Sequence, residues 1–394
     1  MIEQVRHLVN KRVTSPVYLI HWILNKCNAR CSFCFIFTDD SRYDPSWWPS
    51  LEEIERVTKG FGPELYNVNL TGGEPFIRDD IAEIVRAYVL NAHIKSVQIT
   101  TNGWFTERVE RTVRRILNEN QDLAVSITMS LDAIGPEHDH IRRLPGLFNH
   151  LVETFRALEA LQADRLAVNF NVTVSTLNQD KLDEVYDFLT KTLHATSIGA
   201  IAVRGNPLDP TTKAFDINKY KAFARRIEEG LKCGELRGYR GFAGADLINA
   251  KNIIARRNIS RTVETNEYIS PCYAGQLMAV LHANGDVYPC EILSKKIGNL
   301  KEHEYSFVRL WADARRRELY KWIRDTNCHC SFECAWTLNT LYNPRYLPEV
   351  AKTYVQVKLG RLTRPGRTAS TRVAAPSTLA KSATEESAHA ESAA

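Results

Sequence analysis

The stretch Lys26-Cys-Asn-Ala-Arg-Cys-Ser-Phe-Cys-Phe35 carries three cysteines, Cys27, Cys31 and Cys34, in the spacing C-x3-C-x2-C. Iron–sulfur clusters are held by cysteine thiolates, and three thiolates can hold a [4Fe–4S] cluster by three of its irons. The fourth iron would then stay open to a small-molecule ligand. No fourth cysteine lies nearby, so the spacing favours a cluster whose fourth iron binds a small molecule.

Two other interpretations of the three cysteines are weaker. A structural zinc site closes with four ligands, and no fourth Cys or His lies within a few residues. The nearest histidine, His21, sits inside an apolar run and is expected to be a strand residue. A disulfide is disfavoured because residues 1–7 are polar, without the apolar core of a signal peptide. Disulfides are uncommon in cytosolic chains, and we expect a cytoplasmic protein.

The other cysteines are also grouped. Of the nine, three lie at 27–34 and five at 272–334, and only Cys233 is isolated. Scattered core cysteines would not cluster in this way, so the sequence predicts two separate metal sites. Cys233 itself is interpreted as an ordinary thiol, and the alternative is a hydrogen-atom donor.

Composition limits the classes of function. The chain has 394 residues, of which 44% are hydrophobic, and its net charge is +5. That length allows two or three domains, and no apolar run reaches the ~18 residues that span a bilayer. The mild positive charge suits an anionic substrate. No basic run interleaved with aromatic residues indicates nucleic-acid binding.

Between residue 17 and about 205, short apolar strands alternate with amphipathic helices. The first helix begins at Ser50, which forms a capping box with Glu53. This alternation predicts an α/β fold of parallel strands with crossover helices, closed into a barrel or part of one. Chemistry in such folds sits at the carboxyl ends of the strands. The expected strands are 17–24, 66–71, 96–101, 123–131, 166–174 and 197–203, and the later helices lie near 79–92, 106–119, 149–162 and 179–193.

The expected organisation has five segments. After the barrel, residues 216–232 and 245–257 show helical periodicity and belong to a helical connection. From about Thr363 the composition becomes Ala, Ser, Thr and Pro, which cannot bury enough surface to fold. The segments are a lead-in (1–16), the partial barrel (17–210), a helical connection (211–262), a cysteine-bearing domain (263–345) and a C-terminal segment that is mostly a disordered tail (346–394).

The run Thr71-Gly72-Gly73-Glu74-Pro75 follows the second expected strand. Alone it reads as a glycine-rich turn that lets the backbone approach a ligand. Together with the three cysteines it resembles the radical S-adenosylmethionine (radical SAM) superfamily, in which an aromatic residue such as Phe33 is typical before the third cysteine. The resemblance implies a partial (β/α)6 barrel. It also implies that SAM chelates the open iron and that the reduced cluster cleaves it to methionine and a 5′-deoxyadenosyl radical.

The resemblance also implies which residues contact SAM. Gly72, Gly73 and Glu74 would bind its amino group. Polar residues at the ends of the next strands would meet its ribose, carboxylate or adenine; they are Asn102, Ser130 and Asn171, with Thr173 beside them. Arg142 is either an anion-binding residue or a solvated surface arginine. Arg204, at the end of the sixth strand, is a candidate for binding a carboxylate or phosphate of the substrate.

The second cysteine group begins with a predicted hairpin, Cys272-x12-Gly285-x4-Cys290, whose turn carries the hairpin signal Asn284-Gly285. It continues with Cys328-x-Cys330-x3-Cys334. Two cysteines from each part would complete a four-cysteine site. The pattern resembles the SPASM and twitch extensions of radical SAM enzymes, which carry auxiliary [4Fe–4S] clusters. Five cysteines suffice for one such cluster. Cys330 and Cys334 are favoured as the second pair, with Cys328 as the alternative, and a zinc ribbon would suit the same spacing.

The predicted function is a radical SAM enzyme of the oxidoreductase type, acting on a small or lipid-linked molecule with help from an auxiliary cluster. It would need an external one-electron donor such as flavodoxin or ferredoxin. The first alternative is a maturase of a ribosomally made peptide, although about 16 residues before the first strand are too few for a separate leader-binding domain. The second is a zinc-bearing binding protein without catalysis.

Overall fold

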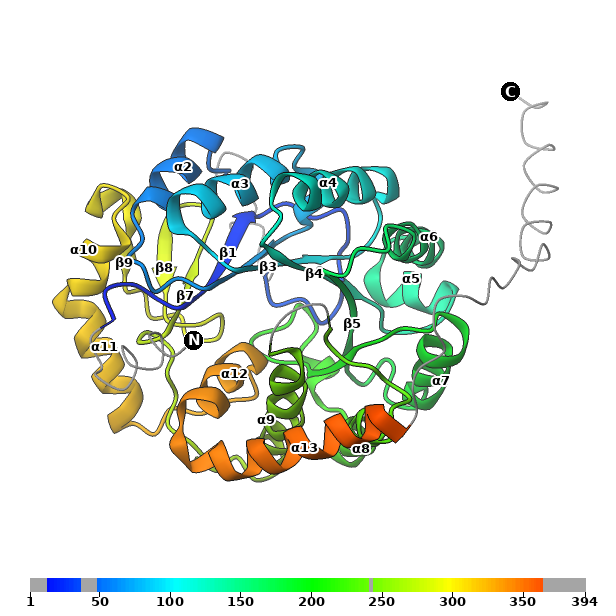
Figure 1. The fold of residues 1–394 in the computed structure, drawn as a ribbon. Coiled ribbons are helices and arrows are strands. Elements are labelled where there is room, and N and C mark those ends of the chain that lie inside the picture. Colours follow the sequence, from blue (N-terminus) through cyan, green and yellow to red (C-terminus); the bar gives the residue numbers. More distant parts are fainter. Residues whose placement is uncertain (1–12, 37–47, 241–243, 364–394) are drawn as a thin grey trace, which may run out of the picture.

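The computed structural model describes residues 13–36, 48–240 and 244–363. Six parallel strands run side by side in the order of the sequence, each after the first hydrogen-bonded to its predecessor. They curve around a central axis in Figure 1. The predicted α/β partial barrel is therefore confirmed. The strands are β1 (Tyr18–Leu24), β2 (Asn67–Gly72), β3 (Ser96–Thr101), β4 (Ala124–Ser130), β5 (Leu166–Val174) and β6 (Ile198–Ala202).

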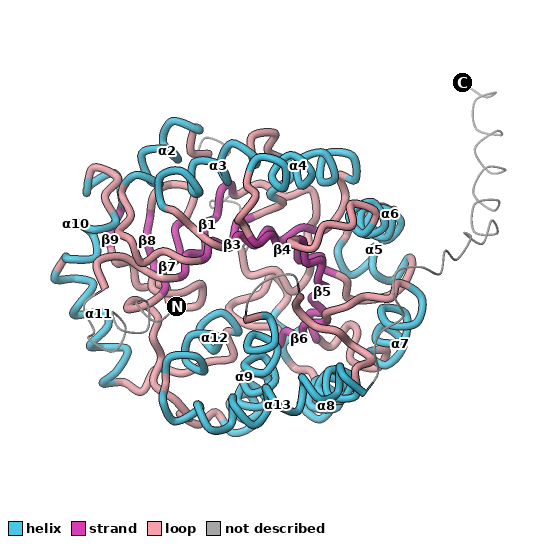
Figure 2. The backbone as a smooth tube through the Cα atoms, viewed as in Figure 1, coloured by secondary structure: helices cyan, strands magenta, loops and turns pink. Residues whose placement is uncertain are grey.

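Helices connect these strands and lie on the outside of the curved sheet, as Figure 2 shows. The predicted capping box at the first of them is present, because Ser50 and Glu53 each accept a hydrogen bond from the other's backbone. Helix α5, which carries Arg142, lies where the sequence analysis predicted no helix. The helices are α2 (Leu51–Lys59), α3 (Ile81–Ala92), α4 (Thr106–Glu119), α5 (Pro136–Arg142), α6 (Leu147–Glu159) and α7 (Leu182–Asp187).

The expected helix at 179–193 is shorter than predicted. It consists of α7 followed by a π-helical turn, Phe188–Thr192. By contrast, the helix predicted at 245–257 continues further, as α9 (Ala245–Thr265), and α8 (Ile217–Cys233) agrees with the prediction. The periodic apolar pattern therefore locates these helices but not their ends.

The predicted hairpin is confirmed, and it is part of the barrel sheet. Strand β7 (Met278–Leu281) pairs antiparallel with β8 (Asp286–Tyr288), while its other edge pairs in parallel with β1. Strand β9 (Gly298–Asn299) completes a nine-stranded sheet. The hairpin loop is longer than the two residues that Asn-Gly suggests: His282 N donates to Asp286 O, and Gly285 takes a φ of +91°.

The C-terminal part of the described chain is helical. Helices α10 (Phe307–Ala312), α11 (Ala314–Asp325) and α12 (Glu333–Tyr342) follow the hairpin, and α13 (Leu347–Thr363) packs against α8 and α9. The sequence analysis predicted no helix between residue 346 and the tail that begins at about Thr363, whereas the structure has α13 there. Val350, Thr353 and Val357 give this helix a buried face that the composition of the tail obscured. The predicted tail beyond residue 363 lies outside the described residues.

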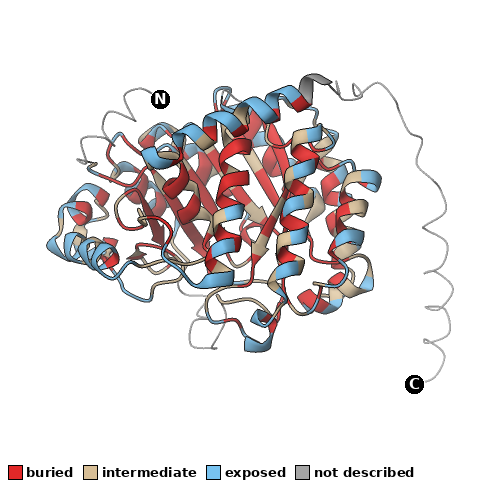
Figure 3. Ribbon diagram, turned by 90° about the horizontal axis from the view of Figure 1, so that it is seen from below, coloured by how far each residue is buried: buried red, intermediate tan, exposed pale blue. Residues whose placement is uncertain are grey.

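The two faces of the sheet bury different sets of side chains. In β1, Leu19 and Ile23 pack with the outer helices, whereas Ile20 and Trp22 belong to a second cluster that includes Cys290 and Phe332. Figure 3 shows the buried strands beneath helices with exposed outer faces. The inner face of the barrel is thus in contact with the cysteine-bearing C-terminal segment. Among the described helices, none is long and apolar enough to cross a membrane.

Candidate active site

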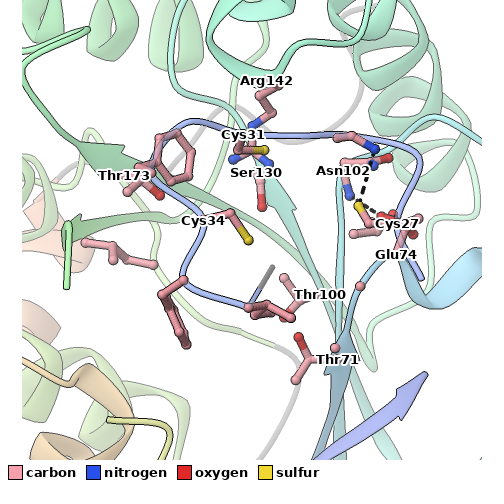
Figure 4. A pocket seen from close by; sticks show the side chains of 18 of the residues that line it. Cys27, Cys31, Cys34, Thr71, Glu74, Thr100, Asn102, Ser130, Arg142 and Thr173 are labelled. Carbon is pink, nitrogen blue, oxygen red and sulfur yellow. Dashed lines mark hydrogen bonds between the residues drawn. The ribbon is translucent and has the colours of Figure 1, made fainter. Parts of the chain in front are cut away.

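A cavity of about 190 Å³ lies at the carboxyl ends of the barrel strands. Figure 4 shows the three cysteines of the first loop facing the ends of the neighbouring strands across it. Nearly all of the site residues predicted within the barrel are brought together here. Those that line the cavity are Cys27, Cys31, Phe33, Cys34, Gly72, Gly73, Glu74, Asn102 and Ser130, and Arg142, Thr173 and Arg204 line it as well.

Asn171 is the exception among the predicted SAM-binding residues. It lies two residues before Thr173 on β5, and its side chain packs over Gly199 of β6 rather than lining the cavity. Cys233 does not line the cavity either, and it is exposed at the end of α8. Sequence reasoning missed Thr71, Thr100 and the apolar residues 201–203, all of which line the cavity. The signal that could have found them is their position at strand ends.

The two glycines are explained by contact with the cysteine loop. A Cβ on Gly73 would lie 1.8 Å from Lys26 O, and a Cβ on Gly72 would lie 2.1 Å from Leu24 O. Glu74 N donates to Lys26 O at 2.9 Å. The turn after β2 is therefore pressed against the loop that carries Cys27. Glycine is required here for close packing between two backbones, whereas the sequence suggested close approach to a ligand.

Glu74 is the buried acidic group of the site, with 1% of its surface exposed. Its carboxylate accepts hydrogen bonds from Thr101 Oγ1 (2.7 Å), Asn102 N (2.7 Å) and Phe76 N (3.1 Å). Burial raises its pKa to about 7, although these donors act in the opposite direction. The three bonds fix the carboxylate at the cavity wall. Because a carboxylate has four acceptor positions, one position remains for a ligand.

Arg142 is buried, so the interpretation as a solvated surface arginine is wrong. Its Nε and Nη2 lie 2.8 and 2.7 Å from Oδ2 of Asp132, which is completely buried. The other carboxylate oxygen accepts from Thr173 N at 2.8 Å. The Arg142 carbonyl in turn accepts from Arg30 N at 3.1 Å. This ion pair therefore connects α5, the end of β4, β5 and the cysteine loop.

Among the cysteines of the first loop, Cys31 is buried, and Cys27 and Cys34 are half-buried. Burial raises the pKa of Cys31 to about 11 and that of Cys27 well above its usual range. Ala29 N donates to Cys27 Sγ at 3.4 Å. Buried thiols of this kind stay protonated near neutral pH unless a cation takes the place of the proton. Backbone N–H groups directed at sulfur are among the features that tune iron–sulfur clusters, so this donor set fits such a cluster.

Four of the five C-terminal cysteines form one electrostatic group. Burial raises the pKa of the Cys272 thiol, and Cys330, Cys290 and Cys328 raise it further. The Cys290 thiol, whose pKa burial raises to about 12, is influenced by Cys330 and Cys328 as well, and it accepts from Leu293 N at 3.4 Å. Cys272 and Cys330 receive backbone hydrogen bonds from Ala274 and Phe332. The same N–H···S arrangement thus recurs at both cysteine groups.

Cys334 has different surroundings. Its sulfur accepts from Tyr18 Oη at 3.5 Å, at the start of β1. Burial raises its pKa to about 12, Glu291 and Glu333 raise it further, and Arg204 acts in the opposite direction. The sequence favoured Cys330 and Cys334 as the second pair of ligands. Electrostatic influence links Cys328 and Cys330 to the hairpin cysteines, while Cys334 packs in the same apolar cluster as all four.

Arg204 lies between the cavity and the second cysteine group. It forms ion pairs with Glu333, next to Cys334, and with Glu291, next to Cys290, the latter at 3.5 Å. Trp22 Nε1 also donates to Glu291 at 3.1 Å. The guanidinium thus already faces two carboxylates, which weakens the idea that it binds an anionic group of the substrate.

Within residues 13–36, 48–240 and 244–363, no three His, Cys, Asp or Glu side chains lie close enough together to surround a single metal ion. The cysteines of each group nevertheless converge on one region, at the cavity and at the hairpin respectively.

Comparison with protein families agrees with this geometry. Residues 23–189 match the radical SAM superfamily, and residues 272–335 match the iron–sulfur cluster-binding SPASM domain. The chain therefore carries a radical SAM domain followed by a SPASM domain. The predicted family is thereby confirmed, and the predicted cofactors are those of the matched families.

Curated relatives include enzymes of different reactions. A GTP 3′,8-cyclase of Klebsiella pneumoniae is 31% identical over 174 residues, which are 42% of this chain and 49% of the cyclase. The match thus spans about half the length of the cyclase. An AdoMet-dependent heme synthase of Methanosarcina barkeri is 24% identical over 328 residues, covering 79% of this chain and 86% of the synthase.

Solved structures share the whole fold. The enzyme anSMEcpe with bound AdoMet aligns with a TM-score of 0.56 at 16% identity, over 89% of this chain and 95% of its own. Streptococcus suis SuiB bound to its precursor peptide SuiA aligns with a TM-score of 0.57 at 16% identity, over 82% and 70%. These similarities concern the fold of both the barrel and the C-terminal part.

Proposed function

We propose that this chain is a radical SAM enzyme whose first cysteine loop holds a SAM-binding [4Fe–4S] cluster and whose C-terminal cysteines hold an auxiliary one. The observation that carries the proposal is the convergence of Cys27, Cys31 and Cys34 with Glu74 on one cavity at the strand ends. When bound, the cluster and SAM supply a one-electron cleavage that yields methionine and a 5′-deoxyadenosyl radical, which takes a hydrogen atom from the substrate.

The residues of this chain have separate tasks in the proposal. Glu74 offers its remaining acceptor position to the ammonium group of SAM, and its three hydrogen bonds hold the carboxylate still. Asn102 connects β3 to the cysteine loop, because its Nδ2 donates to Asn28 Oδ1 at 2.8 Å. Ser130 and Thr173 offer hydroxyl groups at the cavity wall. Phe35 and Ile36 cover the cavity with apolar surface, which excludes water from a reactive intermediate.

We assign the ligands of the auxiliary cluster to Cys272, Cys290, Cys328 and Cys330. Their mutual electrostatic influence and the N–H groups directed at three of the sulfurs support this choice. Cys334, hydrogen-bonded by Tyr18, is left out of the set. An external one-electron donor of the flavodoxin or ferredoxin type would reduce the clusters.

The substrate class favoured here is a small or lipid-linked molecule that undergoes oxidation or bond formation. The similarity to the heme synthase over most of both chains supports a small substrate. A peptide is the second candidate, because the SuiB structure with its precursor peptide shares the fold. Incubation of the reconstituted enzyme with candidate substrates in deuterated form separates the two, since deuterium moves into 5′-deoxyadenosine only from the true substrate.

The first test is anaerobic reconstitution followed by measurement of iron and of 5′-deoxyadenosine formed from SAM with a chemical reductant. We expect about eight irons per chain in the wild type and about four in the Cys27→Ala, Cys31→Ala, Cys34→Ala variant, because each four-iron cluster is lost with its thiolates. The triple variant should form no 5′-deoxyadenosine. Cys233→Ala is the matched control, since this cysteine is exposed and outside both groups.

The ligand assignment is tested by two single variants. Three thiolates can still hold four irons, so Cys328→Ala should change the electron paramagnetic resonance signal of the reduced auxiliary cluster, whereas Cys334→Ala should leave that signal unchanged. The reverse result would return the assignment to Cys330 and Cys334. A protein that binds zinc in place of iron at the C-terminal cysteines, or a wild type that never cleaves SAM, would contradict the proposed function.

A further inference from the structure

Helix α13 presents an apolar row to the solvent. Leu347, Val355 and Leu359 are 56%, 53% and 55% exposed, and Ala351 between them is exposed as well. The four residues are spaced by four positions, so they form one ridge along the helix, about 18 Å long at 1.5 Å per residue. Leu90 is the only other large hydrophobic side chain of the described residues that is more than half exposed.

The opposite face of α13 holds the helix firmly in place. Val350, Thr353 and Val357 are buried, and a Cβ on Gly360 would lie 1.7 Å from Lys232 O of α8. Figure 1 shows α13 at the edge of the molecule, across α8 and α9. The apolar row therefore belongs to a fixed helix, and it stays exposed because no other described element covers it.

Positive charge accompanies the row. Lys352 and Lys358 are exposed on either side of it. The sequence beyond the described residues continues the pattern, because no Asp or Glu occurs between Glu349 and Glu385. The cations in that stretch are Lys352, Lys358, Arg361, Arg364, Arg367, Arg372 and Lys381.

We propose that this face of α13, defined by Leu347, Ala351, Val355 and Leu359 with Lys352 and Lys358, attaches the protein reversibly to an anionic lipid bilayer. A helix lying in the membrane interface needs aliphatic side chains on one face and cations at its borders. Each cation near an anionic leaflet adds attraction. Apolar contact and charge together give the two signals that peripheral attachment requires.

Other partners fit the face less well. A second copy of this chain would bring the same cations against each other, which is unfavourable. A nucleic acid would use the cations but leave the aliphatic row without a partner, because phosphates dominate such binding. The inference concerns a surface separate from the cavity, and it does not depend on the proposed reaction.

The test is co-sedimentation of the full-length protein with vesicles of phosphatidylcholine, alone or with phosphatidylglycerol added, at low and high salt. We expect binding only with phosphatidylglycerol and a decrease as salt rises. The variant Leu347→Ser, Val355→Ser, Leu359→Ser should bind vesicles at least about tenfold more weakly than the wild type. Its thermal unfolding curve should be unchanged, because these side chains are mostly exposed. The variant Lys352→Gln, Lys358→Gln should also bind more weakly.

Leu90→Ser is the matched control, since Leu90 is 59% exposed and is the one large hydrophobic side chain of α3 that is exposed. It should bind vesicles as the wild type does. Equal sedimentation with both kinds of vesicle, no sedimentation at all, or no effect of the triple serine variant would overturn the proposal. Self-association that the serine variant abolishes would identify a second copy as the partner, and RNA binding lost only in the lysine variant would identify nucleic acid; either result overturns it too.

Discussion

The ion pair between Arg142 and Asp132 offers the sharpest test of how the site is built. Replacement of Arg142 by Met keeps most of the side-chain volume but leaves the Asp132 carboxylate without a cation. Asp132 has no solvent exposure, and the hydrogen bond that its carboxylate would keep comes from Thr173 N. Breaking a buried pair by removing one partner costs about 3–5 kcal/mol. We expect Arg142→Met to lose that much stability in the iron-free protein.

Urea denaturation followed by far-ultraviolet circular dichroism measures the loss. The control is Arg114→Met, which removes an exposed pair with Glu110 within α4 and should cost less than about 1 kcal/mol. The double variant Arg142→Met, Asp132→Asn removes both charges, so it should be more stable than Arg142→Met alone. A loss below about 1 kcal/mol for Arg142→Met, or single effects that simply add in the double variant, would refute the reasoning.

Three further predictions concern other parts of the barrel. His21 is buried beside Tyr88 Oη at 2.9 Å, and burial, with Arg78, lowers its pKa to about 3. The unfolded chain therefore binds the proton more readily, and stability should fall by about 2 kcal/mol from His21 alone between pH 7.5 and pH 5. Thermal unfolding at both pH values should show a smaller fall for His21→Gln, and an equal fall would contradict this. Glu74→Gln should weaken SAM binding about 10- to 100-fold in equilibrium dialysis, because a charged acceptor is lost; unchanged affinity would remove Glu74 from the SAM site. Gly73→Ala should abolish iron binding at the first loop but not at the C-terminal cysteines, since the added Cβ would displace Lys26 O; a full iron content would show that the loop can move.

The features that sequence predicted well are those encoded by neighbouring residues. The six strands appear as apolar runs, and the capping box of Ser50 and Glu53 is a pattern of four residues. The cysteine loop and the turn at Gly72–Glu74 are likewise local motifs. The hairpin before Cys290 was predictable from Asn284-Gly285, although its loop is longer than the motif suggests.

The features that sequence could not supply depend on contacts between distant residues. Nothing in the hairpin indicates that β7 pairs with β1, more than two hundred residues earlier. The burial of Arg142 depends on Asp132 at the end of β4. Asn171 shared the polar character of the other strand-end residues, but its position two residues before Thr173 leaves it outside the cavity. Helix α13 was missed because its exposed row and its buried face are both apolar, which removes the amphipathic signal.

These long-range contacts decide how the two cysteine groups sit relative to each other. The hairpin is joined to β1 by backbone hydrogen bonds, and Arg204 at the end of β6 reaches Glu291 and Glu333 beside the second group. The C-terminal segment is therefore fixed to both edges of the six-stranded barrel. Each attachment adjoins a cysteine: Glu291 follows Cys290, and Glu333 precedes Cys334. The separation between the cavity and the auxiliary site is thus set by the barrel itself, and a substrate in the cavity would meet the second site in one defined geometry.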